Sequence, residues 1–108
     1  MLTTPIQIAQ ATAVFANGGN LCSPLIKQDD RPNCTKMPMS NETLQTVREG
    51  MKQACDTGGT GWPFFEFSVK NKRVNVGCKT GTAESHGVGK PEPHAWFTVF
   101  APFDNPEI

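Results

Sequence analysis

VNVGCKTGTAES, residues 74–85, is the stretch of sequence that decides the fold. Its alternating apolar and polar residues predict a β-strand. That strand runs directly into a lysine, two threonines and a glycine at residues 79–82, and no helix pattern follows. Three interpretations compete for these four residues: a phosphate-binding loop, a carboxylate-binding edge of a sheet, and an ordinary hairpin strand.

The composition sets limits on the class of protein. A chain of 108 residues forms one domain at most. Nine prolines and ten glycines indicate many loops around a single core. Ten basic and ten acidic residues cancel, which argues against nucleic acid or an anionic membrane surface as a partner. The apolar runs are too short for a transmembrane helix or a signal peptide within this sequence.

Two helices are predicted near the start and the middle of the chain. Thr4, Pro5 and Gln7 form a capping box with proline at the first helical position, and residues 17–19 (Asn-Gly-Gly) end this alanine-rich helix. Ser40 is the predicted N-cap of the second helix. The buried face of the second helix is expected to contain Leu44, Val47, Met51 and Ala54 or Cys55, and its solvent face Gln45, Arg48, Glu49 and Lys52.

The last third of the sequence is predicted to be β. Residues 64–69 and 73–80 flank a polar turn, which indicates a hairpin. After a loop at residues 83–93, residues 94–101 form a last strand with side chains bulky enough for burial on both faces. A short strand is also expected near residues 21–27. Because helices precede strands, the pattern favours an α+β fold.

The four cysteines leave two states open. They contain no Cys-x-x-Cys pair, so zinc binding is disfavoured. Cys22 and Cys34 bracket a polar, proline-containing loop and form a disulfide if the compartment is oxidising. The alternative is four free, mostly buried thiols. Cys55 and Cys78 are expected to lie on apolar faces.

The phosphate interpretation of residues 79–82 is tested by spacing. A P-loop has the pattern Gly-x4-Gly-Lys-[Ser/Thr] and is followed by a helix whose N-terminus faces the phosphates. Aligning the lysine of that motif with Lys79 places its two glycines at Arg73 and Cys78, so both are missing. The sequence that follows is a proline-containing loop. We therefore reject a phosphate-binding loop.

A carboxylate-binding edge fits the chemistry of these residues better. In an extended strand Lys79 and Gly81 point to one face and Thr80 and Thr82 to the other, and local twist brings neighbours around one cleft. Lysine supplies a positive potential, and the threonine hydroxyls donate hydrogen bonds to a carboxylate. Gly81 lets an extended peptide lie against the strand. On the motif alone, an exposed hairpin strand with a glycine bulge remains the structural alternative.

Three blocks of sequence carry a family resemblance. LTTPIQIAQATAVFANGG (residues 2–19), GCKTGTAE (77–84) and HAWFTVFAPFDNPEI (94–108) closely resemble, in this order, the C-terminal half of the transpeptidase domain of class B penicillin-binding proteins. The resemblance implies an incomplete α+β fold in which helices pack on an antiparallel sheet. It also implies that residues 1–108 are a partial transpeptidase domain, the half that contains Lys-Thr-Gly.

The resemblance implies a reaction and a role for each residue of the motif. Such enzymes cleave the terminal D-Ala–D-Ala bond of a peptidoglycan stem peptide through a serine acyl-enzyme, transfer the acyl group to an amine, and are acylated by β-lactams. By carry-over, Lys79 and Thr82 are the catalytic candidates, because Lys79 supplies positive potential and the Thr82 N–H is an oxyanion-hole donor. Thr80, Gly81 and Thr82 are the substrate-binding candidates. No metal or cofactor is implied.

Two other family motifs, Ser-x-x-Lys and Ser-x-Asn, are absent from this sequence. None of its four serines has lysine three residues later or asparagine two residues later. We expect the chain to begin after these motifs, so that the parent protein is the enzyme and the chain alone is inactive. The expected partners of the parent are stem peptide and β-lactams. Its expected location is the outer face of the cytoplasmic membrane or the periplasm, with an anchor elsewhere in the parent.

Other interpretations stay open at this point. The chain can be a non-catalytic module that binds a peptide or a β-lactam, or a relative of a β-lactam sensor or D,D-carboxypeptidase. Exposed sheet edges and the alanine-rich helix predict self-association of the chain alone. Residues 59–61 (Gly-Thr-Gly) match a Gly-Thr that commonly precedes the Lys-Thr-Gly strand in the family. Residues 62–65 are expected to pack beside the cleft, and a simple hairpin core is the alternative for Phe64, Phe65 and Phe67. His86 and His94 are assigned surface or structural roles.

Overall fold

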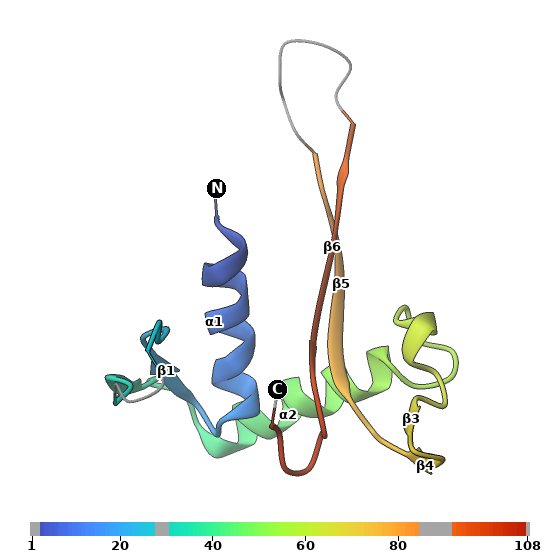
Figure 1. The fold of residues 1–108 in the computed structure, drawn as a ribbon, viewed down its shortest axis with the longest axis horizontal. Helices are drawn as coiled ribbons and strands as arrows, with labels where there is room; N and C mark the ends of the chain where they lie inside the picture. The colour runs from blue at the N-terminus through green and yellow to red at the C-terminus, as the bar shows by residue number, and fades with distance from the viewer. Residues whose placement is uncertain (1–2, 28–30, 85–91, 108) are drawn as a thin grey trace.

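The computed structural model describes residues 3–27, 31–84 and 92–107 (Figure 1). Within them two α-helices accompany three antiparallel two-stranded sheets, which confirms the predicted α+β class. The elements in chain order are α1 (Pro5–Ala16), β1 (Asn20–Cys22), β2 (Cys34–Lys36), α2 (Asn41–Ala54), the 3-10 helix η1 (Trp62–Phe64), β3 (Ser68–Val69), β4 (Lys72–Arg73), β5 (Gly77–Ala83) and β6 (His94–Phe100).

Helix α1 begins and ends where local sequence signals place its limits. The backbone N–H of Thr4 donates to Gln7 Oε1 at 2.8 Å, and the Thr4 side chain accepts from the Gln7 N–H, so the predicted capping box is confirmed. Asn17 is the C-cap, and Gly18 and Gly19 follow with positive φ, which glycine adopts without a steric cost. Only Val14 of α1 is buried.

Helix α2 starts at its predicted cap but buries a different set of side chains. The Ser40 hydroxyl accepts from the Thr43 N–H at 3.0 Å, which confirms the cap. Leu44 and Met51 are buried as expected, whereas Val47 remains 36% exposed. The prediction that Arg48 faces water is wrong, because this residue is only 7% exposed.

Arg48 is buried because it supplies donors that α1 lacks. The last carbonyls of a helix have no partner within the helix, and α1 has no basic residue in its own last turn. The Arg48 guanidinium donates to the carbonyls of Phe15 and Ala16 at that end and to the carbonyl of Phe103. It also lies 5.3 Å from the ring centre of Phe100 and 4.8 Å from that of Phe103. One side chain therefore joins α1, α2 and the segment after β6.

The main hairpin pairs strands other than the predicted ones. Strand β5 pairs along its whole length with β6, from Gly77 opposite Phe100 to Ala83 opposite His94. The predicted hairpin of residues 64–69 and 73–80 is confirmed only in part, because its pairing is limited to the two-residue strands β3 and β4. Lys70 and Asn71 form that turn with φ of 50° and 61°, the left-handed conformation that two-residue hairpin turns use. Part of the predicted loop at 83–93 lies outside the described residues.

The core lies at the base of the β5–β6 hairpin. The ring of Phe100 occupies the space above Gly77, so a Cβ at that glycine would overlap it. Phe100 packs with Met51 and Phe103, and Phe15 and Ala16 of α1 lie against them. Further along β6 the prediction of burial on both faces fails within the described residues, since Phe97 is 39% and Val99 37% exposed.

Both pairs of cysteines form disulfides. The Cys22–Cys34 bond is confirmed and joins β1 to β2. The strand expected near residues 21–27 is only three residues long, Asn20–Cys22. The expectation that Cys55 and Cys78 lie on apolar faces is correct, because both are buried. The alternative of free thiols is wrong, because Cys55 and Cys78 are bonded to each other. The bond joins the C-cap of α2 to β5.

The elements surround the hairpin unevenly. In Figure 1, α2 crosses the base of the β5–β6 hairpin, α1 stands beside its lower part, and the other end of the hairpin extends beyond both helices. The small sheets β1–β2 and β3–β4 lie on opposite sides of this centre. Among the described residues, neither helix is long and apolar enough to cross a membrane.

Replacing Arg48 with alanine tests the link between the two helices. We expect Arg48→Ala to lower the free energy of unfolding of the protein by about 3 kcal/mol, because three carbonyls lose their donor in a buried place. Glu49→Ala changes an exposed residue of the same helix and is the control. The measurement is chemical denaturation of both variants. Equal stability of the two would contradict the role assigned to Arg48.

Candidate carboxylate-binding strand

Strand β5 presents the four candidate residues along one short segment. Alternate residues of a strand point to opposite faces. Lys79 and Gly81 share the face of Gly77, which is the face that α1 and α2 cover through Phe100. Thr80 and Thr82 share the face of Cys78. Lys79, Thr80 and Gly81 line a groove of about 310 Å³ whose other walls come from α1, α2 and β6.

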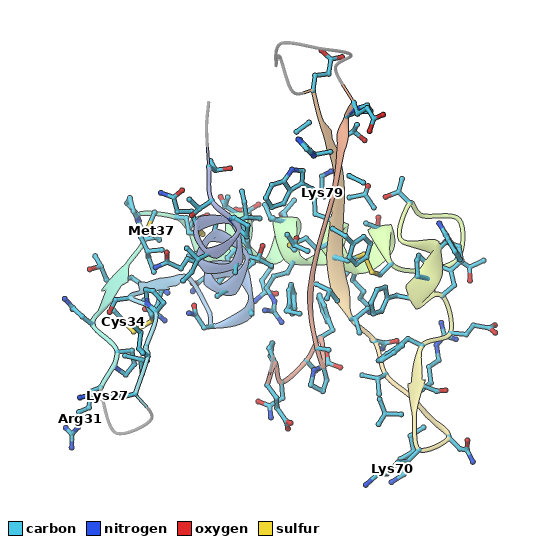
Figure 2. The ribbon with its side chains drawn as sticks, turned by 45° about the horizontal axis from the view of Figure 1, so that its top comes forward. Lys27, Arg31, Cys34, Met37, Lys70 and Lys79 are labelled. Atoms are coloured by element: carbon cyan, nitrogen blue, oxygen red, sulfur yellow. A yellow bond between two sulfur atoms is a disulfide. The ribbon has the colours of Figure 1, made fainter. Side chains whose placement is uncertain are left out.

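Lys79 lies on the exposed middle part of the hairpin. Its ammonium group donates a hydrogen bond to the carbonyl oxygen of Thr80 on its own strand. Figure 2 shows Lys79 on the β5–β6 hairpin, whereas Lys27, Arg31 and Lys70 lie at the outer tips of the molecule. Of the four basic residues labelled in Figure 2, Lys79 is the one that lies near the centre of the fold, and it lines the groove.

Thr80 is held by a residue from a distant part of the sequence. Its hydroxyl donates to Thr60 Oγ1 at 3.0 Å. Thr60 lies between the end of α2 and η1, in the Gly59–Thr60–Gly61 segment. The sequence matched this segment to a family Gly-Thr but did not predict its contact with Thr80. The contact joins residues 20 positions apart, so no local pattern indicates it.

Gly81 leaves space beside the strand. A Cβ built at this position would have only the Trp96 Cβ within 4 Å, at an ordinary contact distance of 3.6 Å. The fold itself therefore has room for a larger residue here, in contrast to Gly77. The absence of a side chain at Gly81 keeps the surface of the strand open to a ligand.

Thr82 lies further along the strand and outside the groove. It is exposed, and it is not among the residues that line the groove. Because N–H and C=O groups of alternate residues point to the same edge of an antiparallel strand, the backbone groups of Thr80 and Thr82 share one edge. Within the described residues β5 pairs only with β6, so its second edge has no strand partner.

The aromatic segment after Thr60 packs on the hairpin rather than in a cleft. The Phe64 ring stacks on Phe97 of β6 at 5.2 Å and lies 5.3 Å from Phe67. Phe64 and Phe67 pack against the cluster of Cys55, Val76 and Cys78. This placement favours the core interpretation for Phe64 and Phe67, whereas Trp62 is 75% exposed. His94 is exposed, as expected, and His86 lies outside the described residues.

The strand has the groups that bind an anion and few of those that bind a metal. It offers an ammonium group, two hydroxyls and a strand edge beside a largely apolar groove. Hydrogen bonds to a charged group are roughly twice as strong as neutral ones, so a carboxylate is a suitable ligand. In the part of the chain that the structure describes, no group of three metal-ligating side chains occurs.

Known proteins match this chain over almost its whole length. The model of the penicillin binding protein transpeptidase domain matches residues 1–108. The chain is 27% identical to the peptidoglycan D,D-transpeptidase MrdA of Haemophilus influenzae and covers 19% of that protein. It is 30% identical to the peptidoglycan D,D-transpeptidase PbpA of Mycolicibacterium smegmatis and covers 22% of it. Both alignments include 97% of this chain.

A solved structure shares the fold. In the complex between penicillin-binding protein PBP2 and MreC from Helicobacter pylori, one chain matches with a TM-score of 0.69 and 30% sequence identity. The match covers 96% of this chain and 19% of that one. The present chain thus spans about a fifth of the length of these relatives.

Substitution of two glycines of β5 distinguishes a position that the packing requires from a position that it leaves open. We expect Gly77→Ala to lower the free energy of unfolding by about 1–3 kcal/mol, because the new methyl group overlaps the buried Phe100 ring. Gly81→Ala on the same strand makes only an ordinary contact with the Trp96 Cβ and is the control. Thermal unfolding of the two variants measures the difference. A larger loss of stability in Gly81→Ala than in Gly77→Ala would contradict this packing.

Proposed function

The chain belongs to the penicillin-binding protein transpeptidase family, and we propose that it forms one wall of the acyl-transfer site of a peptidoglycan D,D-transpeptidase. The relatives that it matches are named peptidoglycan D,D-transpeptidases or penicillin-binding proteins. Because the chain spans about a fifth of their length, the activity is proposed for the intact protein that contains this chain.

One observation carries the proposal: Lys79, Thr80 and Gly81 line a groove on a strand that has an edge without a strand partner in the described residues. A stem peptide is an extended chain that ends in a carboxylate. An extended peptide binds to a free strand edge through main-chain hydrogen bonds. Lys79 lies on the groove side of this strand and the Thr80 and Thr82 hydroxyls on its other face. A terminal carboxylate at the unpaired edge between the two faces is then within reach of both the charge and the donors.

The proposed roles follow from the chemistry of each group. The Lys79 ammonium supplies positive potential, and rotation about its flexible stem moves it from the Thr80 carbonyl toward the ligand. The Thr82 hydroxyl donates to the carboxylate of the stem peptide or of a β-lactam. The Thr80 hydroxyl does so when its one proton turns from Thr60 Oγ1 to the ligand, and the Thr60 hydroxyl then donates to Thr80. The N–H of Thr82 donates to the acyl oxygen as negative charge develops on it, and one such donor contributes about 3 kcal/mol to the transition state.

The nucleophile comes from another part of the intact protein. No serine of this sequence has the lysine partner of the family's Ser-x-x-Lys motif. The serine attacks the D-Ala–D-Ala carbonyl, D-Ala leaves, and the acyl group passes to an amine of a neighbouring strand. The residues of this chain bind the carboxylate, orient the carbonyl and stabilise the developing charge. They form no covalent bond with the substrate.

Two disulfides support a site of action outside the cytoplasm. Both pairs of cysteines are bonded, and structural disulfides persist in oxidising compartments such as the periplasm or the cell surface. Peptidoglycan lies in the same compartments. We therefore place the intact protein at the outer face of the cytoplasmic membrane or in the periplasm, with any anchor in a part of the protein beyond these residues.

A binding module without catalysis is the second candidate for the chain alone. The missing serine motifs favour it. In that case the 108-residue chain binds a peptide that ends in D-Ala–D-Ala, forms no covalent adduct with penicillin, and loses binding in Lys79→Ala. Titration with the peptide decides between binding and no binding. The self-association expected of the chain alone stays a prediction.

Labelling of the intact protein with fluorescent penicillin tests the proposed function. We expect Lys79→Ala to lower the second-order rate constant of acylation by about 10²-fold or more, because the positive potential at the carboxylate is lost. Lys70→Ala is the matched control, because it removes a lysine at the distant β3–β4 turn. Labelling at the rate of the unchanged protein in Lys79→Ala, or no labelling of the intact protein, would contradict the proposal.

A further inference from the structure

We propose that the Cys55–Cys78 disulfide holds the Lys79–Thr80 segment in its binding geometry, so that the site is fully competent only in the oxidised protein. The inference rests on the proposed function, because it concerns the same strand. It adds a covalent, redox-sensitive positioning device to the site. The bond acts through its neighbours and does not touch the substrate.

The bond is placed directly beneath the site. Cys78 immediately precedes Lys79 in β5 and is 0% exposed. Cys55 is the C-cap of α2 and is also buried. Their Cα atoms lie 5.7 Å apart, within the usual span of a disulfide. The bond therefore fixes the start of the Lys-Thr-Gly segment to the end of a helix that is anchored in the core.

The disulfide also supports the residue that holds Thr80. Gly61 packs against both sulfurs: a Cβ there would lie 2.6 Å from Cys78 Sγ and 3.0 Å from Cys55 Sγ. Its neighbour Thr60 accepts the hydrogen bond from the Thr80 hydroxyl at 3.0 Å. The backbone N–H of Gly61 donates to the Ala54 carbonyl at 2.7 Å. The segment that carries Thr60 thus lies between the end of α2 and the disulfide.

Reduction cannot leave this packing unchanged. Two sulfurs in van der Waals contact lie about 1.5 Å further apart than two bonded sulfurs. Gly61 is already in contact with both sulfurs on one side, and Val76, Phe64 and Phe67 surround the pair. The thiols therefore press on these neighbours, and we expect β5 at Cys78 and the segment of Gly61, which lie closest to the sulfurs, to shift. Such a shift displaces Thr80 relative to Thr60.

The redox step is balanced by thiol–disulfide exchange. When the bond forms, the two thiols lose two electrons and two protons, and a protein disulfide that acts as the oxidant becomes a dithiol. A dithiol reductant reverses the reaction and is itself oxidised to a disulfide. Because both cysteines are buried once the bond has formed, a reductant reaches it only when this region opens.

The second disulfide provides a matched control within the same chain. Cys22–Cys34 joins β1 and β2, which pack beside α1 and away from the β5–β6 hairpin. Its Cys34 is exposed. Substitution or reduction of this bond makes the same chemical change as at Cys55–Cys78, but it leaves the packing around Cys78 intact. A positioning role specific to Cys55–Cys78 therefore predicts different results for the two bonds.

The experiment compares two penicillins on the intact protein. Benzylpenicillin carries the carboxylate that Lys79 and Thr80 are proposed to bind, and its methyl ester does not. The ratio of their second-order acylation rate constants, measured by mass spectrometry, reports recognition of the carboxylate. Because unfolded protein reacts with neither compound, partial unfolding lowers both rates and leaves the ratio unchanged. Alkylation of thiols followed by peptide mass analysis measures which disulfide is open.

We expect the acid-to-ester ratio to fall about tenfold in Cys55→Ala/Cys78→Ala and in protein whose Cys55–Cys78 bond has been reduced, since small displacements of positioning groups cost this much or more. Cys22→Ala/Cys34→Ala should keep the ratio of the unchanged protein. An unchanged ratio after loss of Cys55–Cys78, or an equal fall in the control, overturns the inference. No acylation of the oxidised protein by benzylpenicillin instead overturns the proposed function itself.

Discussion

Phe100 fills the space that Gly77 leaves on the opposite strand, and this contact fixes where the β5–β6 hairpin meets the helices. The same ring packs against Met51 and Phe103, and the Arg48 guanidinium lies over it. Arg48 in turn binds the carbonyls at the end of α1. The position of the hairpin, and of every residue on it, therefore depends on close packing at its base.

The β5–β6 hairpin is tightly packed at its base and exposed further along, so that one part holds the fold together and the other carries the proposed site. From Val76 to Cys78 the chain is buried, and Cys78 is linked by a disulfide to the end of α2. From Lys79 onward its side chains line a groove or face solvent. A binding site built on a rigid element holds its donors more precisely than one built on a loop. The change from buried to exposed falls between Cys78 and Lys79, at the start of the motif.

Local features of this chain were predictable from the sequence, and long-range ones were not. The caps at Thr4 and Ser40 depend on residues three positions apart, and both were predicted. Arg48 looked like a solvent-facing residue because its partners are carbonyls about 30 and 55 positions away, which no helical pattern reveals. The β5–β6 pairing and the Cys55–Cys78 bond were missed for the same reason. The order of strands along the chain does not specify which strands pair, and the spacing of cysteines does not specify which cysteines bond.

The sequence indicated the residues of the candidate site but not their surroundings, and the roles of those residues stay a prediction. The motif and the family resemblance indicated Lys79–Thr82, while the contact of Thr80 with Thr60 needed the fold. The most direct test of the account is a crystal structure of the intact protein acylated by benzylpenicillin. We predict that the ligand carboxylate lies about 3 Å from the hydroxyls of Thr80 and Thr82, with the acyl oxygen facing the Thr82 N–H. A carboxylate that points away from β5 into solvent would contradict the account.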